Sequence, residues 1–156
     1  MFSSVNLSSP LSLYSIPVVW FTAFYPNAWK FSTINNTIGY DNVQPRSNTA
    51  KFSENKNISP RLAAKVQRME GAHLNGNEAF PLWTAAILAA NIAGLDNALM
   101  NKVSLAYIGL RVLFNQVYIN QETVGTSWFR TAVFFASNLM PMTLLIRAAQ
   151  KLAAER

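Results

Sequence analysis

Apolar residues along the chain form four blocks separated by polar stretches. No Asp, Glu, Lys or Arg occurs before Lys30, and the apolar block from about residue 10 to 29 is long enough to cross a bilayer as a helix. Pro10, Pro17 and Pro26 predict the start of this helix, a kink and its end. A cleavable secretory signal is disfavoured, because no basic residue precedes the apolar run and no small-residue cleavage site follows it.

A polar stretch rich in Asn and Ser extends from about residue 31 to 60 and predicts a loop, because it has no helical period. Seven basic residues lie from Lys30 to Arg68, against only Asp41 and Glu54 on the acidic side. By the positive-inside rule, this excess predicts a cytosolic loop. Nucleic-acid binding is disfavoured, because the stretch lacks the folded basic face with interleaved aromatic side chains that such binding needs.

The second apolar block continues a long helix that starts near the end of the loop. Ser59 and Pro60 are typical of a helix cap and first turn. The part up to Glu78 is amphipathic and water-facing, and the part at about 76–95 is apolar enough for the membrane. Gly94–Asn97 predicts the break that ends the helix.

The last two apolar blocks, at about 98–119 and 127–151, are separated by a turn at Gln121–Thr126. Four apolar helical segments predict an all-α, four-helix transmembrane bundle that forms one domain over residues 1–156. The mean hydropathy of +0.13 is low for such a protein, but the polar loop lowers this mean. A soluble bundle is disfavoured, because four such blocks leave it few polar faces.

Composition excludes several kinds of site. The chain has no cysteine, so it can form no disulfide, thiolate metal site or cysteine nucleophile. It has one histidine, which disfavours a histidine-based zinc site. No metal ion is therefore expected.

Three polar residues of the second block, Arg68, Asn75 and Glu78, lie on one helical face and are called the polar stripe here. Charged side chains in a membrane helix are costly unless they face a bundle interior or a wet cavity. The polar stripe is therefore either the wall of a polar cleft or a structural device in which Glu78 pairs with Arg111 or Arg130. The spacing leaves both interpretations open.

Two later arginines raise the same question. Arg111 and Tyr118 are seven residues apart and share a face, so they can hold an anionic ligand or satisfy each other and Glu78. Arg130 lies near the start of the fourth block, where it can form an anion site with free backbone donors or extend to the membrane interface. His73 lies away from the polar stripe and is interpreted as an interfacial residue rather than a catalyst.

The polar stripe belongs to a longer pattern, which consists of Arg68, Ala72-His73, Asn75, Glu78 and Phe80-Pro81. This pattern resembles the signature of the MAPEG family, the membrane-associated proteins in eicosanoid and glutathione metabolism. Three other segments are similar to that family's first loop, third helix and fourth helix: YDNVQPR (40–46), AYIGLRVLFNQVYI (106–119) and SWFRTAVFF (127–135). The resemblance covers nearly the whole chain.

The resemblance implies a four-helix bundle that forms a homotrimer in the endoplasmic reticulum or another internal membrane. It also implies a glutathione site between neighbouring protomers, near the cytosolic ends of the helices. Asn75 and Glu78 would bind glutathione, and Arg111 and Tyr118 would belong to the same pocket. Arg130 would be the catalytic residue, because a positive charge beside the glutathione thiol favours its thiolate form.

The implied activity is that of a glutathione-dependent transferase or peroxidase acting on lipophilic electrophiles or lipid hydroperoxides, which would enter from the bilayer. Three positions depart from the family pattern: Gly71 replaces an arginine, Ala79 a polar or aromatic residue, and Phe114 a tyrosine. Arg68 lies on the same face as Gly71 and is predicted to supply the missing guanidinium, as a glutathione-binding residue. The alternative is a non-catalytic MAPEG-like protein that binds lipid or a membrane partner.

Charge also predicts the topology. The first loop and the Gln121–Thr126 turn should face the cytosol, and both termini and the Gly94–Asn97 turn should face the lumen or the outside. The N-glycosylation motifs at Asn35 and Asn57 should then stay unmodified. A glycan on either residue would contradict this topology.

Overall fold

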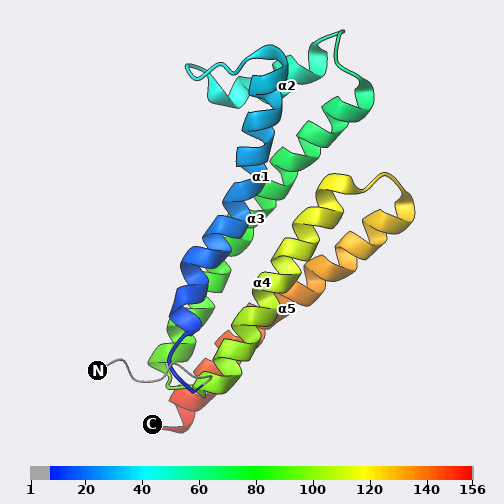
Figure 1. Ribbon diagram of the computed structural model, residues 1–156. Helices are drawn as coiled ribbons and strands as arrows, with labels where there is room; N and C mark the ends of the chain where they lie inside the picture. Colours follow the sequence, from blue (N-terminus) through cyan, green and yellow to red (C-terminus); the bar gives the residue numbers. More distant parts are fainter. Residues whose placement is uncertain (1–7, 156) are drawn as a thin grey trace.

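The computed structural model describes residues 8–155, and every regular element within that range is helical. The elements are a 3-10 turn at Ser12–Tyr14, α1 (Ser15–Ile38), a 3-10 turn at Pro45–Ser47, α2 (Asn48–Glu54), α3 (Pro60–Ile92), α4 (Asn97–Asn120) and α5 (Val124–Ala154). In Figure 1, α1 and α3 run side by side, α4 and α5 form a second pair, and the two pairs pack against each other. The all-α prediction is therefore confirmed.

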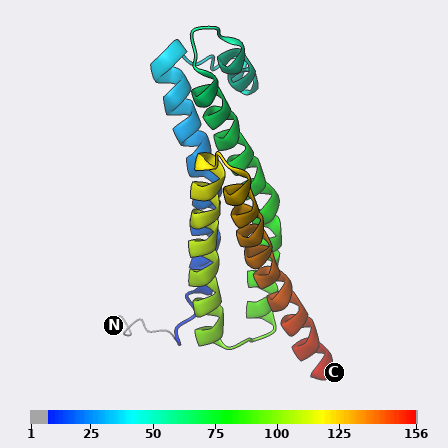
Figure 2. The ribbon, with the colours of Figure 1, turned by 90° about the vertical axis from the view of Figure 1, so that its right-hand side faces the viewer.

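The two pairs differ in length and are offset along the bundle axis. Figures 1 and 2 both show α1 and α3 projecting past the turn between α4 and α5, with α2 at the far end of this projection. The 33 residues of α3 correspond to about 50 Å of helix, against a bilayer core of about 30 Å. Only the start of α3 projects, because Arg68 already contacts Ile119 near the end of α4, whereas the water-facing part was predicted to extend to Glu78.

The four-helix count is not confirmed for the part of the chain described, because a fifth α-helix, α2, forms inside the predicted loop. In addition, α1 continues to Ile38, well past residue 29. Both differences arise from a buried apolar cluster that packs α1, α2 and α3 together. Its members are Ile34, Phe52 and Val66, with Tyr40, Ile58 and Leu62 packed against them. These residues are too widely spaced to produce a helical period in the sequence.

Hydrogen bonds around Asp41 order the segment between α1 and α2. The carboxylate of Asp41 accepts from Lys51 Nζ at 2.7 Å and from the backbone amides of Val43 and Gln44. The bond from Lys51, followed by the bonds from these amides, holds the pKa of Asp41 below its ordinary value of 3.8. Because the ionised form is favoured in the folded state, this contribution is present above pH 3.8 and is lost as the pH falls through the lowered pKa.

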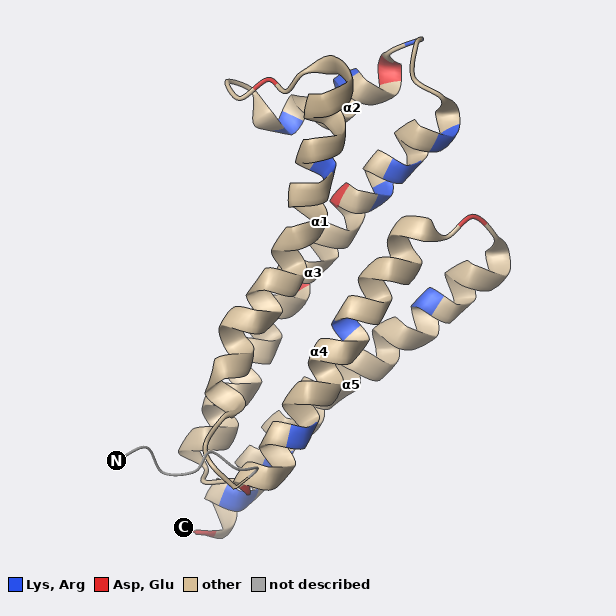
Figure 3. Ribbon diagram, viewed as in Figure 1, with Lys and Arg blue, Asp and Glu red and all other residues tan. Residues whose placement is uncertain are grey.

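Most charged residues lie at this end of the molecule. Figure 3 shows Lys and Arg gathered over α2 and the projecting part of α3, whereas the middle of the bundle has few charges. Of the described helices, α5 is the one whose length and apolar composition meet the criteria for crossing a membrane.

The start of α3 and the break that follows it, both set by local chemistry, were predicted correctly. Ser59 caps α3, where its hydroxyl accepts from the Leu62 amide. Gly94 ends the following turn with a φ of +61°, a conformation that favours glycine. Asp96, which the sequence analysis did not single out, then caps α4 by accepting from the Leu99 amide.

Pro26 was expected to end the first helix, but α1 continues through it. A proline inside a helix leaves the carbonyl four residues earlier without its donor, and here that carbonyl belongs to Thr22. The Asn115 amide from α4 donates to the Thr22 carbonyl at 2.7 Å. The expected kink at Pro17 also has no basis, because this proline lies in the first turn of α1, where a proline is tolerated.

Asn115→Ala is expected to lower the free energy of unfolding by about 1–2 kcal/mol, because the Thr22 carbonyl would lose its donor inside the bundle. Thermal unfolding in detergent micelles measures this change. Gln116→Ala on the exposed side of the same turn is the control, with an expected effect within about 0.5 kcal/mol. Equal effects of the two substitutions would contradict the role given to Asn115.

The α1 and α3 helices cross at Gly76. A Cβ atom at this position would lie 2.6 Å from the Cβ and 2.7 Å from the Cα of Ala23. Small residues at a crossing let two backbones approach closely, which is a common basis of helix association in membranes. The crossing holds the polar stripe on α3 at a fixed position relative to α1.

Gly76→Ala is expected to destabilise the protein by about 1–3 kcal/mol, because the added methyl group meets the backbone of Ala23. Gly109→Ala is a matched control in α4, since a Cβ at Gly109 has no neighbour within 4 Å. There, the change should stabilise the helix by about 0.5–1 kcal/mol. Unfolding midpoints of the two variants should therefore move in opposite directions, and a shift in the same direction would refute the close crossing.

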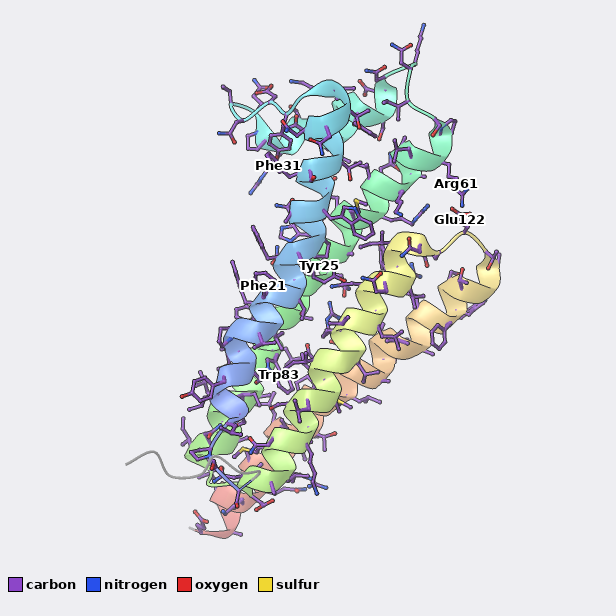
Figure 4. All side chains as sticks on the ribbon, in the orientation of Figure 1. Phe21, Tyr25, Phe31, Arg61, Trp83 and Glu122 are labelled. Atoms are coloured by element: carbon purple, nitrogen blue, oxygen red, sulfur yellow. The ribbon has the colours of Figure 1, made fainter. Side chains whose placement is uncertain are left out.

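Trp83 is the centre of the core that joins α1, α3, α4 and α5. Its ring stacks on Tyr107 with centroids 3.9 Å apart, and its indole N–H donates to the Ser15 hydroxyl at 3.1 Å. Val19 from α1 and Leu144 from α5 belong to the same buried cluster. Figure 4 shows Trp83 at this position in the lower half of the bundle.

Candidate functional site

The first two residues of the polar stripe on α3 contact α4, and the third is exposed at the protein surface. Arg68 Nε donates to the Ile119 carbonyl near the end of α4 at 2.9 Å. Asn75 Oδ1 accepts from Arg111 Nη2 at 3.0 Å. Glu78 is exposed. The structure therefore brings Asn75 and Arg111 together and leaves the Glu78 carboxylate at the surface.

Arg111 is a buried cation without a carboxylate partner in the part of the chain that the structure describes. The residue is only 2% exposed, and its guanidinium lies over the Phe114 ring at 4.8 Å. Nη1 has no hydrogen-bond partner among the described residues. A buried charge that is not neutralised is costly, so the surroundings of Arg111 favour an additional negative charge.

Tyr118 connects α4 with both neighbouring helices. The Arg130 guanidinium of α5 lies 5.1 Å from the centre of its ring, a cation–π distance. On the other side, the Tyr118 hydroxyl approaches Gly71 of α3, where a Cβ atom would lie 2.7 Å from the hydroxyl oxygen. The structure therefore brings Tyr118 and Arg130 together, and glycine at position 71 makes the approach of Tyr118 possible.

The start of α5 positions Arg130. Thr123 and Thr126 form a capping box, in which each side chain accepts from the backbone of the other. Arg130 follows in the second turn, and its Nη2 donates to the Thr131 hydroxyl at 3.4 Å. Because the Thr126 backbone amide already donates to the Thr123 hydroxyl, this donor is not free for an anion. The positive charge that α5 contributes to the site is therefore that of the Arg130 guanidinium.

Ion pairs in the described part of the chain do not involve the predicted site residues. The three pairs are Lys30–Glu70, Lys51–Asp41 and Arg61–Glu122. Pairing of Glu78 with Arg111 or Arg130, the structural interpretation of the polar stripe, is therefore wrong for the single chain. Arg68, Arg111 and Arg130 are held by a carbonyl, an amide, aromatic rings and a hydroxyl, all of them neutral groups.

The pattern that resembled a known family can now be compared with a family model. The model of the MAPEG family matches residues 18–150. The chain belongs to the MAPEG family. Members of this membrane-associated family include glutathione-dependent transferases and peroxidases as well as non-catalytic proteins. Searches of the curated proteins and of the solved structures gave no match.

A polar pocket of about 380 Å³ lies beside the predicted site of this MAPEG protein, between the start of α3 and the end of α4. Three cations and one acid line it: Arg61, Lys65, Arg68 and Glu122. Figure 4 shows Arg61 and Glu122 close together, and Arg61 Nε lies 2.8 Å from Glu122 Oε1. This exposed pair contributes at most about 1 kcal/mol, so the positive charge of the pocket is its main property.

Two polar interactions of the MAPEG chain could not be predicted from sequence patterns. Lys30 is almost fully buried and pairs with Glu70 at 3.0 Å, although the residues are 40 positions apart. His73 Nδ1 lies 2.8 Å from the Ala23 carbonyl. A carbonyl only accepts, so Nδ1 carries a proton and donates, and Nε2 is left to accept from Asn77 at 3.2 Å. His73 thus has two hydrogen-bond partners within its own chain.

Proposed function

We propose that this MAPEG protein binds glutathione as a co-substrate and uses its thiolate to conjugate lipophilic electrophiles or to reduce lipid hydroperoxides. The observation that supports this function is the charge balance of the predicted site. Arg68, Arg111 and Arg130 have only neutral partners, and Glu78 has no ion-pair partner within residues 8–155. Three positive groups and one negative group are thus available.

Glutathione has the complementary set of charges. With its thiol ionised it carries two carboxylates, one thiolate and one ammonium group, a net charge of −2 that matches the +2 of three arginines and Glu78. Arginines suit the carboxylates, since they form paired, charge-assisted hydrogen bonds. A carboxylate such as Glu78 suits the ammonium group. No protein cysteine is required, because the ligand supplies the nucleophile.

Each residue then has a distinct task. Arg130 lies beside the sulfur and stabilises the thiolate, so that its pKa falls below the ordinary value of about 8.5. Tyr118 supports Arg130 through its ring, Arg111 orients Asn75, and Glu78 binds the amino group from the exposed face of α3. This exposure fits a site that is completed by a neighbouring protomer of a homotrimer in an internal membrane.

The chemistry needs no metal ion. In conjugation, the thiolate attacks an electrophilic carbon, a C–S bond forms and the leaving group departs with the bonding electrons. In peroxide reduction, the thiolate attacks the terminal oxygen, the O–O bond breaks, and the resulting alkoxide takes a proton. A second glutathione then displaces water from the sulfenic acid and forms glutathione disulfide.

A thermal-shift measurement with glutathione in detergent micelles tests the binding step. Glutathione at about a hundred times its dissociation constant should stabilise the protein by about 2.7 kcal/mol. Glu78→Gln should reduce the shift, whereas Lys102→Gln, an exposed change near the start of α4, should leave it unchanged. Absence of a shift in the wild type would refute the proposal.

Gly71 supports a second candidate, a non-catalytic MAPEG protein that binds lipid or a membrane partner. An arginine at this position, as the resemblance would lead one to expect, would require the Tyr118 side chain to move, because its Cβ would lie 2.7 Å from the Tyr118 hydroxyl oxygen. Turnover assays with a general lipophilic electrophile separate the two candidates. Binding of glutathione without any turnover would favour the second.

A further inference from the structure

A groove between α4 and α5 lies far from the predicted glutathione site, towards the end of the bundle where α5 terminates. It has a volume of about 210 Å³. Five apolar and two polar residues line it: Leu99, Val103, Leu139, Met140, Leu144, Thr143 and Arg147. The groove is thus an apolar channel with one charged group, Arg147, at one end.

The lining of the groove extends along α5 over a length comparable to the hydrocarbon core of one membrane leaflet. It is formed on one side by α5, the helix that meets the criteria for crossing a membrane. Leu139 is the midpoint of α5, and Arg147 lies eight residues further on, a rise of about 12 Å. Half of a bilayer core is about 15 Å. With Leu139 at the midplane, the apolar lining follows the acyl chains and Arg147 reaches the headgroup level.

Arg147 is available to a ligand. The residue is exposed and takes part in none of the ion pairs of the described chain. No acidic residue lines the groove, and the Thr143 hydroxyl already donates to the Leu139 carbonyl. The guanidinium therefore offers its donors to an anion at the membrane surface, and guanidinium groups bind phosphate well.

We propose that this groove binds one acyl chain of a membrane phospholipid and that Arg147 binds the phosphodiester of its headgroup. The apolar lining of the groove favours a hydrocarbon chain, and its length along α5 favours a lipid of one leaflet. The single cation, Arg147, favours a phosphate group. A second groove of about 310 Å³, between α1 and α4, is also apolar but has no charged residue in its lining. It therefore offers hydrocarbon contact without recognition of a headgroup. The proposal does not depend on glutathione binding.

Lipid binding to the purified protein can be measured by native mass spectrometry. Dioleoyl phosphatidylcholine should bind about fivefold more tightly than dioleoylglycerol, which has the same chains and no phosphate, because one basic residue at the interface contributes about this factor. Arg147→Gln should reduce the ratio to about one, and Arg147→Lys should keep most of it. Lys102→Gln removes a nearby cation that does not line the groove and should keep the wild-type ratio.

Three results would overturn the proposal. One is equal binding of the two lipids by the wild type, and another is an unchanged ratio in Arg147→Gln. The third is tighter binding of oleate than of phosphatidylcholine, which would assign the groove to a free fatty acid. Leu139→Trp provides a separate measurement, because this exposed residue can fill the groove without disturbing the core. It should reduce the number of bound phospholipids by one, and an unchanged number would contradict the location.

Discussion

Arg130→Ala is expected to lower kcat/KM for glutathione conjugation by about 10²–10³-fold, which is the usual cost of removing one charge-stabilising donor from an active site. Among the described residues the guanidinium has no carboxylate partner, and it lies over the Tyr118 ring at 5.1 Å, so its charge is available to the sulfur. Without it, the pKa of the bound thiol should rise towards about 8.5. Steady-state rates and the ultraviolet absorbance of the thiolate, measured against pH, report both effects.

Controls for this experiment separate charge from structure. Arg130→Lys keeps the positive charge and should retain part of the thiolate absorbance. Lys102→Ala removes an exposed cation outside the site and should leave the rate unchanged. The unfolding midpoint of Arg130→Ala should stay near that of the wild type, because the residue is only half-buried. Full thiolate absorbance in Arg130→Ala would show that another group activates the thiol.

Trp83→Ala is expected to lower the free energy of unfolding by about 3–5 kcal/mol, the range for deleting a large buried ring. Trp83 has no exposed surface, stacks on Tyr107 and donates to Ser15. Its loss leaves a cavity between the two helix pairs and a buried hydroxyl without its donor. Unfolding in detergent micelles, followed by circular dichroism, measures the change.

Two other tryptophan variants define the source of this effect. Trp83→Phe keeps an aromatic ring for Tyr107 but loses the bond to Ser15, and it should cost about 1–3 kcal/mol. Trp128→Ala removes a ring that is 70% exposed and should change stability by less than about 0.5 kcal/mol. If Trp83→Ala lowers the free energy of unfolding no more than Trp128→Ala does, Trp83 does not hold the two helix pairs together.

Helix existence and several helix ends were determined by the sequence alone. Ser59 and Asp96 cap their helices through bonds that span three residues, and Gly94 takes a φ of +61°. Such interactions are local, so the chemistry of a few neighbouring residues decides them. Family membership was also evident from the sequence, because the segments that resemble the MAPEG family lie within residues 18–150, which the family model matches.

Interactions between distant segments decided the elements that the sequence analysis missed. Pro26 should interrupt a helix, yet α1 continues. The Asn115 side-chain amide, 93 residues away in the chain, donates a hydrogen bond to the Thr22 carbonyl that Pro26 leaves without a donor. In the same way, α2 forms in a polar stretch, because Phe52 packs against Ile34 and Val66. Neither partner is visible in a local window of sequence.

The same division holds within the candidate site. Helical periodicity determined that Arg68, Asn75 and Glu78 share one face of their helix, since side-chain direction follows from position along the helix. Only the tertiary structure decided that Asn75 meets Arg111 and that Glu78 forms no ion pair within residues 8–155. The rotation and offset of one helix against another depend on packing at crossings such as that of Gly76 with Ala23, and periodicity contains no information about that packing.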